Sequence, residues 1–270
     1  MDRLSISAER KTEVMQLLRR SLYLSTVDPE AGDLARSYGL GLELAEFCTA
    51  WNLDDEFVPT DRKVRKELRG ISRAVLHAPY NELFPCAIDR KARALAAERY
   101  LQTVEVASLY GIKKIVVHGA YDPHLYFPEW FIPQSAAFFQ ELAPKLPEDV
   151  TLCLENVLEP EPFLLADIVR QVDDPRIRMC LDVGHAQAYS HAGPLQWLSQ
   201  CQDVLAHFHV HNNDGSQDLH GPLSEGVIPM TRLLKEIQAL CPDATVTLEI
   251  PQVRSSIIWL QEQDLLEETK

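Results

Sequence analysis

Short apolar runs alternate with longer amphipathic stretches along the chain from Ser21 onward. Strand-length runs separated by helix-length segments are typical of a parallel sheet, and eight such strands indicate closure into a barrel. No linker, low-complexity tract or repeat interrupts the pattern. The sequence therefore predicts an α/β fold, one (β/α)8 TIM barrel domain over residues 1–270, with strands at Ser21–Ser25, Leu40–Phe47, Ala74–Pro79, Lys114–Gly119, Thr151–Val157, Ile177–Val183, Val204–Asn212 and Thr245–Ile250.

Helix signals occupy the intervening segments. Arg90–Tyr110 is rich in Ala and Leu and stops before Gly111, a residue suited to a helix C-terminus. Pro162–Val172 and Pro229–Leu240 each begin with a proline, which helices favour in their first turn. Residues 1–20 are charged and helix-prone, and we expect an N-terminal helical extension there.

Alternation within the strands predicts which side chains enter the barrel. In Thr151–Val157, Leu152 and Leu154 share one face, whereas Cys153 and Glu155 share the other. Large aliphatic residues should face the helices, so the mixed set should face the barrel interior. The same inward parity applies to His118, Cys180, Asp182, His207, His209, His211, Thr247 and Glu249.

Composition suggests a cytoplasmic protein. The charged N-terminus lacks the apolar core of a secretory signal, and no apolar run approaches the roughly 20 residues of a membrane span. Six cysteines without a CxxC pair indicate reduced thiols rather than a disulfide framework. No P-loop, GxGxxG or nucleophile elbow is present, which argues against nucleotide-binding folds and serine hydrolases.

Net charge bears on partners. The chain carries a formal charge of −14, whereas nucleic-acid binding relies on Lys and Arg surfaces. We therefore expect a small-molecule partner, with no nucleic acid and no membrane. The sequence does not determine the oligomeric state, and a homo-oligomer is compatible with it.

Metal-capable side chains lie at or just past the ends of successive strands. Zinc and manganese take imidazole nitrogens and carboxylate oxygens, and the carboxyl ends of barrel strands make such groups converge. Each residue alone has a plain alternative: a histidine can be a hydrogen-bonded structural residue, and a glutamate an ion-pair partner. A ring of buried carboxylates without cations would repel itself, however. We expect one to three divalent ions, zinc or manganese, held by residues drawn from His77, His118, Glu155, Asp182, His185, His211, Asp218, His220 and Glu249.

Residues around this set carry weaker signals. His207 lies two residues deeper than His209 and is interpreted as a packed barrel histidine; His209 either supports a ligand or is structural. Glu43, with Glu46, follows the second strand and is either a contact for substrate hydroxyls or a solvated acid. We also expect substrate contacts from Asn156 and from Arg254, which could hold an anionic group, although a surface arginine is the commoner case.

The amino-acid sequences of several segments resemble those of a known family. HAPYNELFP, GIKKIVVHGAY, CLEN, MCLDVGHA, HVHNNDGSQDLHGPLSEGVIP and VTLEIP occur in an order and spacing similar to the xylose isomerase-like TIM barrels. That superfamily includes sugar-phosphate isomerase/epimerase-type proteins and the endonuclease IV group. The resemblance covers roughly residues 20–260, and its second half is the more specific.

Two activities follow from the resemblance. In the ketose epimerase branch, Glu155, Asp182, His211 and Glu249 match the ligands of one divalent ion. Glu155 and Glu249 would then exchange a proton with the substrate in an enediolate-type reaction, with His185 beside them as a further catalytic residue. One departure stands out: those epimerases carry an arginine shortly after the histidine of strand seven, and this chain has Gly215–Gln217 there.

The endonuclease IV branch binds three zinc ions through nine ligands, and all nine residue types are present here. That branch implies a zinc-dependent phosphodiesterase acting on abasic-site DNA. The charge of −14 and the short HAPYNELFP loop argue against it. The leading hypothesis is therefore a divalent-metal-dependent sugar or sugar-phosphate isomerase/epimerase with a carbohydrate substrate, and the phosphodiesterase is the alternative.

Overall fold

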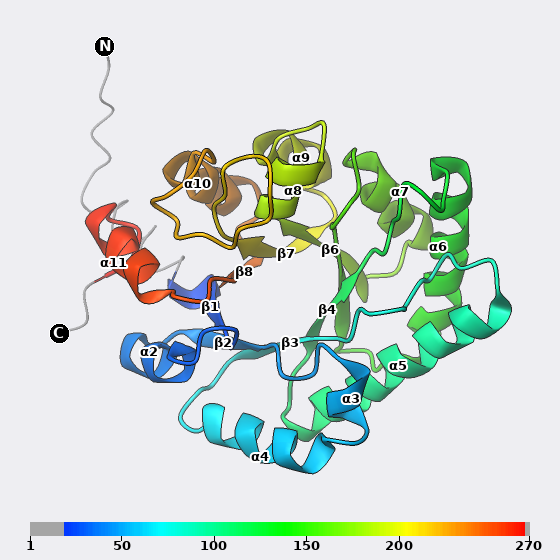
Figure 1. Cartoon of the computed structure of the whole chain (residues 1–270), viewed down its shortest axis with the longest axis horizontal. Helices are drawn as coiled ribbons and strands as arrows, with labels where there is room; N and C mark the ends of the chain where they lie inside the picture. The colour runs from blue at the N-terminus through cyan, green and yellow to red at the C-terminus, as the bar shows by residue number, and fades with distance from the viewer. Residues whose placement is uncertain (1–18, 268–270) are drawn as a thin grey trace.

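The computed structural model describes residues 19–267, and it forms a closed barrel of eight parallel strands (Figure 1). Each strand pairs with its neighbours in sequence, and β1 closes the ring by pairing with β8. This confirms the predicted (β/α)8 TIM barrel. The helical extension expected over residues 1–20 lies, except for its last two residues, outside the described residues. The strands are β1 Leu22–Ser25, β2 Gly41–Leu44, β3 Ala74–His77, β4 Lys114–His118, β5 Thr151–Glu155, β6 Ile177–Asp182, β7 Leu205–Val210 and β8 Thr245–Leu248.

Helices surround the barrel, and the three expected from the sequence form within a residue of their predicted ends. The longest begins where the Asp89 side chain accepts a hydrogen bond from the Lys91 amide, and the chain leaves it through Gly111 at φ +70°. The helices are α2 Ala31–Tyr38, α3 Ala50–Leu53, α4 Phe57–Glu67, α5 Arg90–Leu109, α6 Pro128–Leu142, the 3-10 turn η1 Ala143–Lys145, α7 Phe163–Val172, α8 Val183–Tyr189, α9 Pro194–Cys201, α10 Met230–Leu240 and α11 Arg254–Glu262.

Strand parity divides the core into two parts. The outward-facing Leu152 and Leu154 belong to the large apolar layer between strands and helices. Cys153 and Cys180 belong to a small cluster inside the barrel. Strand register then places His118 opposite Glu155, so the metal-capable residues of neighbouring strands end at the same height. The inward parity predicted from the sequence is confirmed for these strands.

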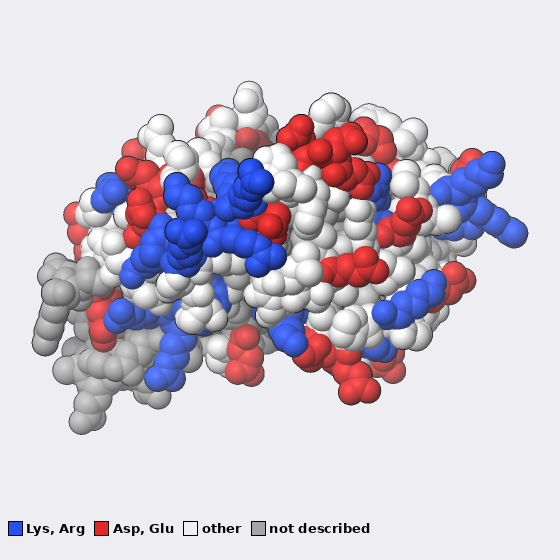
Figure 2. All heavy atoms as spheres, turned by 90° about the horizontal axis from the view of Figure 1, so that it is seen from below, with Lys and Arg blue, Asp and Glu red and all other residues white. Residues whose placement is uncertain are grey.

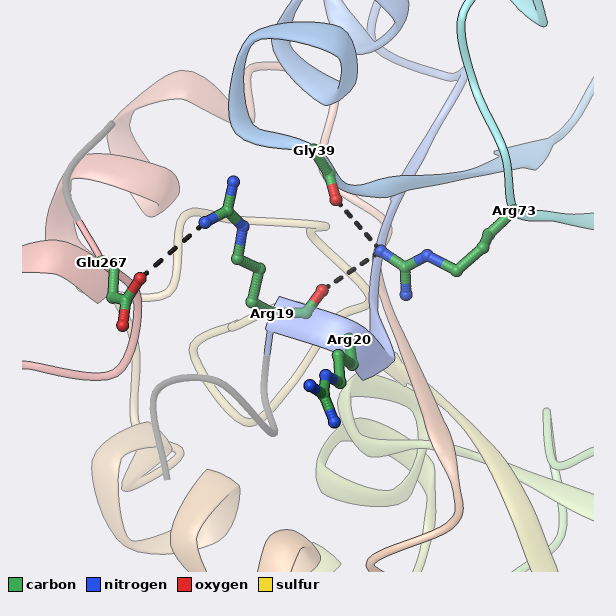
Figure 3. Close-up of a pocket in the computed structure, with 5 residues that line it drawn as sticks. All are labelled: Arg19, Arg20, Gly39, Arg73 and Glu267. Atoms are coloured by element: carbon green, nitrogen blue, oxygen red, sulfur yellow. Dashed lines mark hydrogen bonds and ion pairs between the residues drawn. The ribbon is translucent and has the colours of Figure 1, made fainter. Parts of the chain in front are cut away.

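Arginines brace the floor of the barrel, where the strands begin. The Arg73 guanidinium donates to the carbonyls of Arg19 and Gly39 at 3.1 and 3.2 Å (Figure 3). It also lies over the Tyr23 ring. These bonds tie the residues before β3 to those before β1 and β2. A cavity at this floor is lined by Arg19, Arg20, Gly39, Arg73 and Glu267, the five residues drawn in Figure 3. The floor therefore contributes to stability at the end of the barrel opposite the metal-capable residues.

No helix in the span 19–267 has the length and apolar content needed to cross a membrane. All six cysteines are free, and five of them are buried.

Tyr23 leaves no room for a side chain at Gly41. A Cβ there would lie 2.2 Å from a ring carbon of Tyr23, which is itself held under Arg73. We expect Gly41→Ala to lower the free energy of unfolding by about 1–3 kcal/mol, as overpacked cores do. Gly193→Ala is the matched control, because nothing lies within 4 Å of its Cβ position. Urea unfolding of both variants measures the difference, and equal stabilities would contradict this packing argument.

Candidate metal centre

The nine candidate ligands gather at the mouth of the barrel. His77, His118, Glu155 and Asp182 are the last residues of β3 to β6, and His211 and Glu249 directly follow β7 and β8. His185 lies in the first turns of α8, while Asp218 and His220 lie in the long loop after β7. Parallel strands present their carboxyl ends on one face, so residues distant in sequence meet there. The side chains form three adjoining groups.

The first group lies at the ends of β3, β4 and β5. The Nε2 atoms of His77 and His118 lie 3.2 and 3.5 Å from the same carboxylate oxygen, Oε2 of Glu155. Nδ1 of His77 faces the Ala78 carbonyl at 2.8 Å, which fixes the ring. The His118 ring stacks on Tyr80 with 4.3 Å between centroids. Burial lowers the pKa of His118 to about 4, so its imidazole is neutral near pH 7, the form that binds metals.

The second group joins two glutamates through one histidine. Nδ1 of His209 lies 3.1 Å from Glu155 Oε1 and 3.2 Å from Glu249 Oε2. With Asp182, these three residues place one ligand atom each within 4.8 Å of one another. Burial disfavours the imidazolium, yet the pKa of His209 lies well above its usual value because Cys180 and the carboxylates of Glu43, Glu155 and Glu249 favour the charged ring. His211 adds Nε2 at 3.2 Å from Asp182.

The third group is formed by His185, Asp218 and His220. Oδ2 of Asp218 lies 3.2 Å from His185 Nε2 and 2.9 Å from His220 Nε2. Burial raises the pKa of the Asp218 carboxyl, but its hydrogen bonds to both histidines outweigh burial and hold that pKa well below its usual range. Burial lowers the pKa of His220, and the bond to Asp218 outweighs it and raises the pKa to about 9.

Backbone carbonyls fix the histidines in a way that suits a bound cation. Nδ1 of His77, His185 and His220 faces the carbonyl of Ala78, Asn156 and Glu249 respectively, each at 2.8 Å. A neutral ring that donates from Nδ1 has only a lone pair on Nε2, and each of these Nε2 atoms faces a carboxylate oxygen. Two acceptors this close need a proton or a cation between them.

Two buried polar atoms in the described residues add to this fit. His211 Nδ1 and Asp218 Oδ1 are buried without a hydrogen-bond partner, although each belongs to the ring of ligands. Imidazole nitrogens together with carboxylate oxygens are the donor set of zinc and manganese sites. The residues present therefore fit one or more divalent ions.

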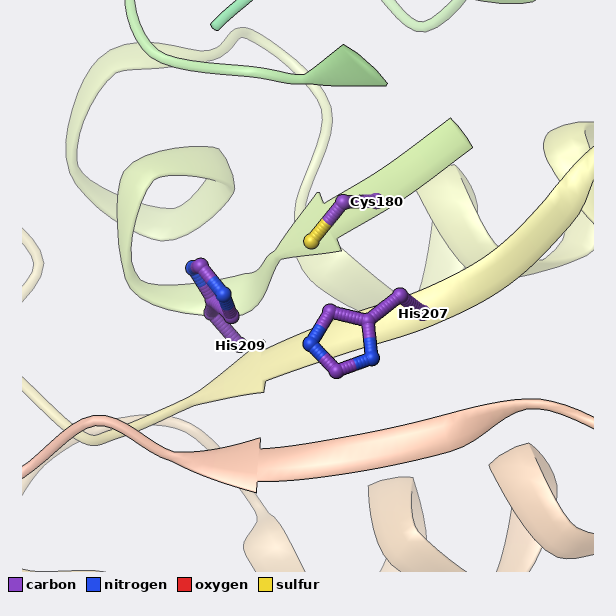
Figure 4. A group of neighbouring side chains, drawn as sticks. All are labelled: Cys180, His207 and His209. Atoms are coloured by element: carbon purple, nitrogen blue, oxygen red, sulfur yellow. The ribbon is translucent and has the colours of Figure 1, made fainter. Parts of the chain in front are cut away.

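A further group, Cys180, His207 and His209, lies deeper in the barrel (Figure 4). Both nitrogens of His207 have protein partners: Thr245 Oγ1 at 2.6 Å and Glu43 Oε2 at 2.9 Å. His209 Nε2 faces the other Glu43 oxygen at 2.8 Å. These histidines are satisfied by the protein itself, so this group serves as packing beneath the metal-capable ring.

The three expected substrate-contacting residues have different surroundings. Glu43 is buried, and its carboxylate is engaged by His207 and His209. Arg254 lies at the exposed start of α11 and pairs with Glu30 at 3.1 Å, outside the three groups. Asn156 is buried, and its amide exchanges hydrogen bonds with the Asp182 backbone at 2.8 and 3.0 Å. Asn156 therefore positions Asp182, and Glu43 positions His209.

Sequence reasoning missed Glu159 in the loop after β5. Its carboxyl is buried and accepts hydrogen bonds from the Val157 amide at 2.6 Å and the Tyr121 amide at 3.4 Å. These bonds link the loops that follow β4 and β5, next to His118 and Glu155. The only signal in the sequence was a second acid, four residues after Glu155, in the CLENVLEP segment. Burial raises the pKa of Glu159 to about 7.

The raised pKa of Glu159 predicts a pH-dependent loss of stability. A carboxyl whose pKa is higher in the folded state stabilises the fold below its unfolded pKa, and this contribution is lost as pH rises through about 7. Glu159→Gln cannot ionise and should lack this loss. Between pH 5 and pH 8 we expect the variant to gain about 2–3 kcal/mol relative to the parent protein in urea unfolding. If the free energies of unfolding of the variant and the parent protein change in parallel with pH, Glu159 stays ionised in the folded protein and the prediction is wrong.

Gly184 makes room for His211. A Cβ at Gly184 would lie 1.8 Å from Cε1 of the His211 ring, so the ring would have to move. We expect Gly184→Ala to weaken binding of Zn²⁺ or Mn²⁺ by about 10–100-fold, as displaced ligand supports do. Calorimetric titration measures the affinity, with Gly193→Ala as control. Unchanged affinity in Gly184→Ala would remove His211 from the metal ligands.

Comparison with known proteins agrees with this architecture. The D-tagatose 3-epimerase-like protein is 22% identical, with a TM-score of 0.75 over 90% of this chain and 96% of that one. The TTHB071 protein from Thermus thermophilus, whose crystal was soaked with ZnCl2, is 25% identical, with a TM-score of 0.73 over 90% of this chain and 97% of its own.

The curated relatives are archaeal. The uncharacterized protein MJ1311 of Methanocaldococcus jannaschii is 26% identical over 68% of this chain, and the match spans 66% of its own length, just under two thirds. A family model described as a xylose isomerase-like TIM barrel matches residues 33–269, which is most of the chain. The protein therefore belongs to the xylose isomerase-like TIM barrel family.

Proposed function

We propose that this protein is a divalent-metal-dependent isomerase or epimerase of a small carbohydrate. The observation that carries the proposal is the placement of two carboxylates, those of the buried Glu155 and the largely buried Glu249, around one imidazole nitrogen of His209 at 3.1 and 3.2 Å. Isomerisation beside a carbonyl needs one group to take a proton from carbon and a group to return it. Two carboxylates that share a buried mouth suit this task.

Each residue has a distinct part in the proposed reaction. A divalent ion held by Glu155, Asp182, His211 and Glu249 would polarise the substrate carbonyl and acidify the adjacent C–H bond. One glutamate takes that proton on a carboxylate oxygen, and the other supplies a proton to the opposite face. His185, fixed by the Asn156 carbonyl at 2.8 Å, lies 3.6 Å from Glu155 Oε1 and orients that carboxylate.

The relatives support the reaction class at a coarse level. A neighbour by fold is described as D-tagatose 3-epimerase-like, and another was soaked with zinc chloride. The loop after β7 carries Gly215, Ser216 and Gln217 where ketose epimerases have an arginine. We therefore propose a sugar isomerase or epimerase and do not assign 3-epimerisation.

A second candidate function rests on the third group of ligands. His185, Asp218 and His220 can hold an ion that proton transfer between two glutamates does not need. Several ions in one ring suit zinc-dependent phosphodiester hydrolysis, because adjacent metals stabilise both the attacking and the leaving oxygen. The charge of −14 argues against DNA as the substrate.

Metal content separates the two candidates. The isomerase proposal predicts that one Mn²⁺ or Zn²⁺ per chain, counted by plasma mass spectrometry, restores full activity to the chelated protein. Removing the ion leaves the buried carboxylates unneutralised, so we also expect chelation to lower the melting temperature by several degrees. Phosphodiester hydrolysis that appears only with two or three zinc ions per chain would favour the hydrolase.

Substitution of the paired glutamates tests the proton transfer. Glu155→Gln and Glu249→Gln should each lower exchange of solvent tritium into a ketose such as D-tagatose by about 10²–10⁴-fold, because an amide cannot accept the proton. Glu236→Gln, on the exposed side of α10, is the control and should exchange like the parent protein. Nicking of an abasic-site duplex by a protein that ignores every ketose offered would refute the isomerase.

A further inference from the structure

None of the nine candidate ligands comes from β1 or β2, and a cavity occupies that side of the mouth. Its volume is about 530 Å³, and it lies between the ends of β1 and β2 and the helices α3 and α4. β1 pairs with both β2 and β8, so this cavity adjoins the strand that ends at Glu249. Its lining includes Thr26, Glu46, Cys48, Asn52, Thr60 and Lys63.

The lining of this cavity by residues after β1 and β2 places it beside the metal-capable ring, and the electrostatics of the ring agree with this position. Burial raises the pKa of the Cys48 thiol, and the charges of Glu249 and Glu46 raise it further. Glu249 likewise adds to the raised pKa of Tyr80, after burial and Cys48. Cys48 lines the cavity and is therefore close enough to Glu249 to feel its charge. A substrate whose reactive carbon lies beside Glu155 and Glu249 can extend into this space.

The wall of the cavity is fixed by hydrogen bonds around Glu46. Thr26 Oγ1 donates to Glu46 Oε2 at 2.7 Å and itself accepts from the Ala45 amide at 2.9 Å. Asn52 donates to the Glu46 carbonyl at 2.6 Å. The side chain of Glu46 is only 5% exposed, and its second oxygen, Oε1, has Lys63 Nζ at 3.1 Å but no hydrogen bond of good geometry. Oε1 is therefore a buried acceptor available to a ligand.

The lining favours an uncharged, hydroxyl-bearing ligand. Glu46 and Glu56 contribute two negative charges and Lys63 one positive charge, so the cavity is acidic on balance. Hydroxyls of Thr26 and Thr60 and the Asn52 amide add donors and acceptors of the kind that bind sugar hydroxyls. A phosphate group would meet two carboxylates and one ammonium, which disfavours its binding.

The other basic side chains of α4 do not change this balance. Arg62, Arg65 and Lys66 are exposed and absent from the lining of the cavity. Figure 2 shows Lys and Arg side chains gathered on the outer face of the molecule, where α4 lies. Their charges face solvent and are screened by salt.

We propose that the cavity beside β1 and β2 is a subsite for the hydroxyl-bearing end of an unphosphorylated sugar, with Glu46 as a binding residue. The proposal rests on the proposed isomerase or epimerase function, because it places the rest of the sugar at Glu155 and Glu249. It narrows the substrate class from sugars and sugar phosphates to neutral sugars. Lys63 orients the Glu46 carboxylate and reduces its charge.

Cys48 reports occupancy of the cavity without any need for turnover. Five of the six cysteines are buried, so Cys48 is the thiol that N-ethylmaleimide should reach in the folded, metal-loaded protein. The experiment measures the alkylation rate of Cys48 at pH 8 with increasing D-tagatose or D-tagatose 6-phosphate. We expect protection by D-tagatose at a concentration at least tenfold below that of the phosphate ester.

Variants of the wall test the role of Glu46. In Glu46→Gln, D-tagatose should protect Cys48 about tenfold more weakly, because a charged acceptor is lost. Lys63→Met should also weaken protection, whereas Lys66→Met, on the same helix but outside the lining, should leave it unchanged. Circular dichroism confirms that each variant is folded.

The outcomes separate this subsite from the proposed function. If D-tagatose protects Cys48 from alkylation but the protein exchanges no tritium, the subsite is supported and the isomerase function is refuted. If tritium exchanges but D-tagatose does not protect Cys48, or protects it equally in Glu46→Gln, the subsite is refuted and the isomerase function is not. Stronger protection by the phosphate ester overturns the assignment to neutral sugars.

Discussion

Neutralisation of four carboxylates crowded at the mouth of the barrel is the constraint on which the rest of this structure depends. Glu155, Asp182, Asp218 and Glu249 meet at the mouth of the barrel, and within residues 19–267 their ion pairs are made with histidines. Buried unpaired carboxylates are costly, so protons on those histidines or bound cations must balance them. The raised pKa of His209, despite its burial, is what protonation of these histidines requires. A divalent ion would balance the carboxylates instead, and its binding would release those protons.

Supporting side chains hold the ring in place against this repulsion. Asn156 exchanges two hydrogen bonds with the Asp182 backbone, and Glu43 holds His209 from below. The Asn212 amide contacts Leu223 and Ile228 at both ends of the loop segment beyond His220. These bonds tie the loop that contributes Asp218 and His220 to Asn212 at the end of β7. The polar residues Asn156 and Glu43 thus hold candidate ligands in position, so contacts with a substrate come from other side chains.

Much of this arrangement could be predicted from the sequence, because strand period and strand ends are local properties. The phase of Leu152, Leu154 and Glu155 assigned the inner face correctly, and the ends of β3 to β8 located most of the candidate ligands. Depth along a strand was harder to predict. Glu43 and Glu46 are only three residues apart, yet one lies beneath the ring and the other lines a cavity. That difference arises from where β2 ends, at Leu44, and apolar patterning does not mark this point.

Contacts between distant loops were beyond sequence reasoning for a different physical reason. Glu159 joins the loops after β4 and β5 through backbone amides, and any residue type can supply an amide. The cavity beside β1 and β2 is likewise a space between elements rather than a motif. Gly184 was visible in the sequence as part of Asp-Val-Gly-His, but its contact with His211 depends on how closely α8 approaches the end of β7.

Charge links the number of bound ions to the class of substrate. Four carboxylates with neutral histidines keep a negative excess with one divalent ion, reach balance with two, and become cationic only with three. A phosphodiester is attracted to the three-ion state, whereas a neutral sugar is compatible with any of them. The adjoining cavity contributes Glu46 and Glu56 against the single cation of Lys63, so it extends the negative field toward the open side of the mouth. A ring of this charge, open toward an acidic cavity, favours a neutral ligand whose hydroxyls donate hydrogen bonds to carboxylates.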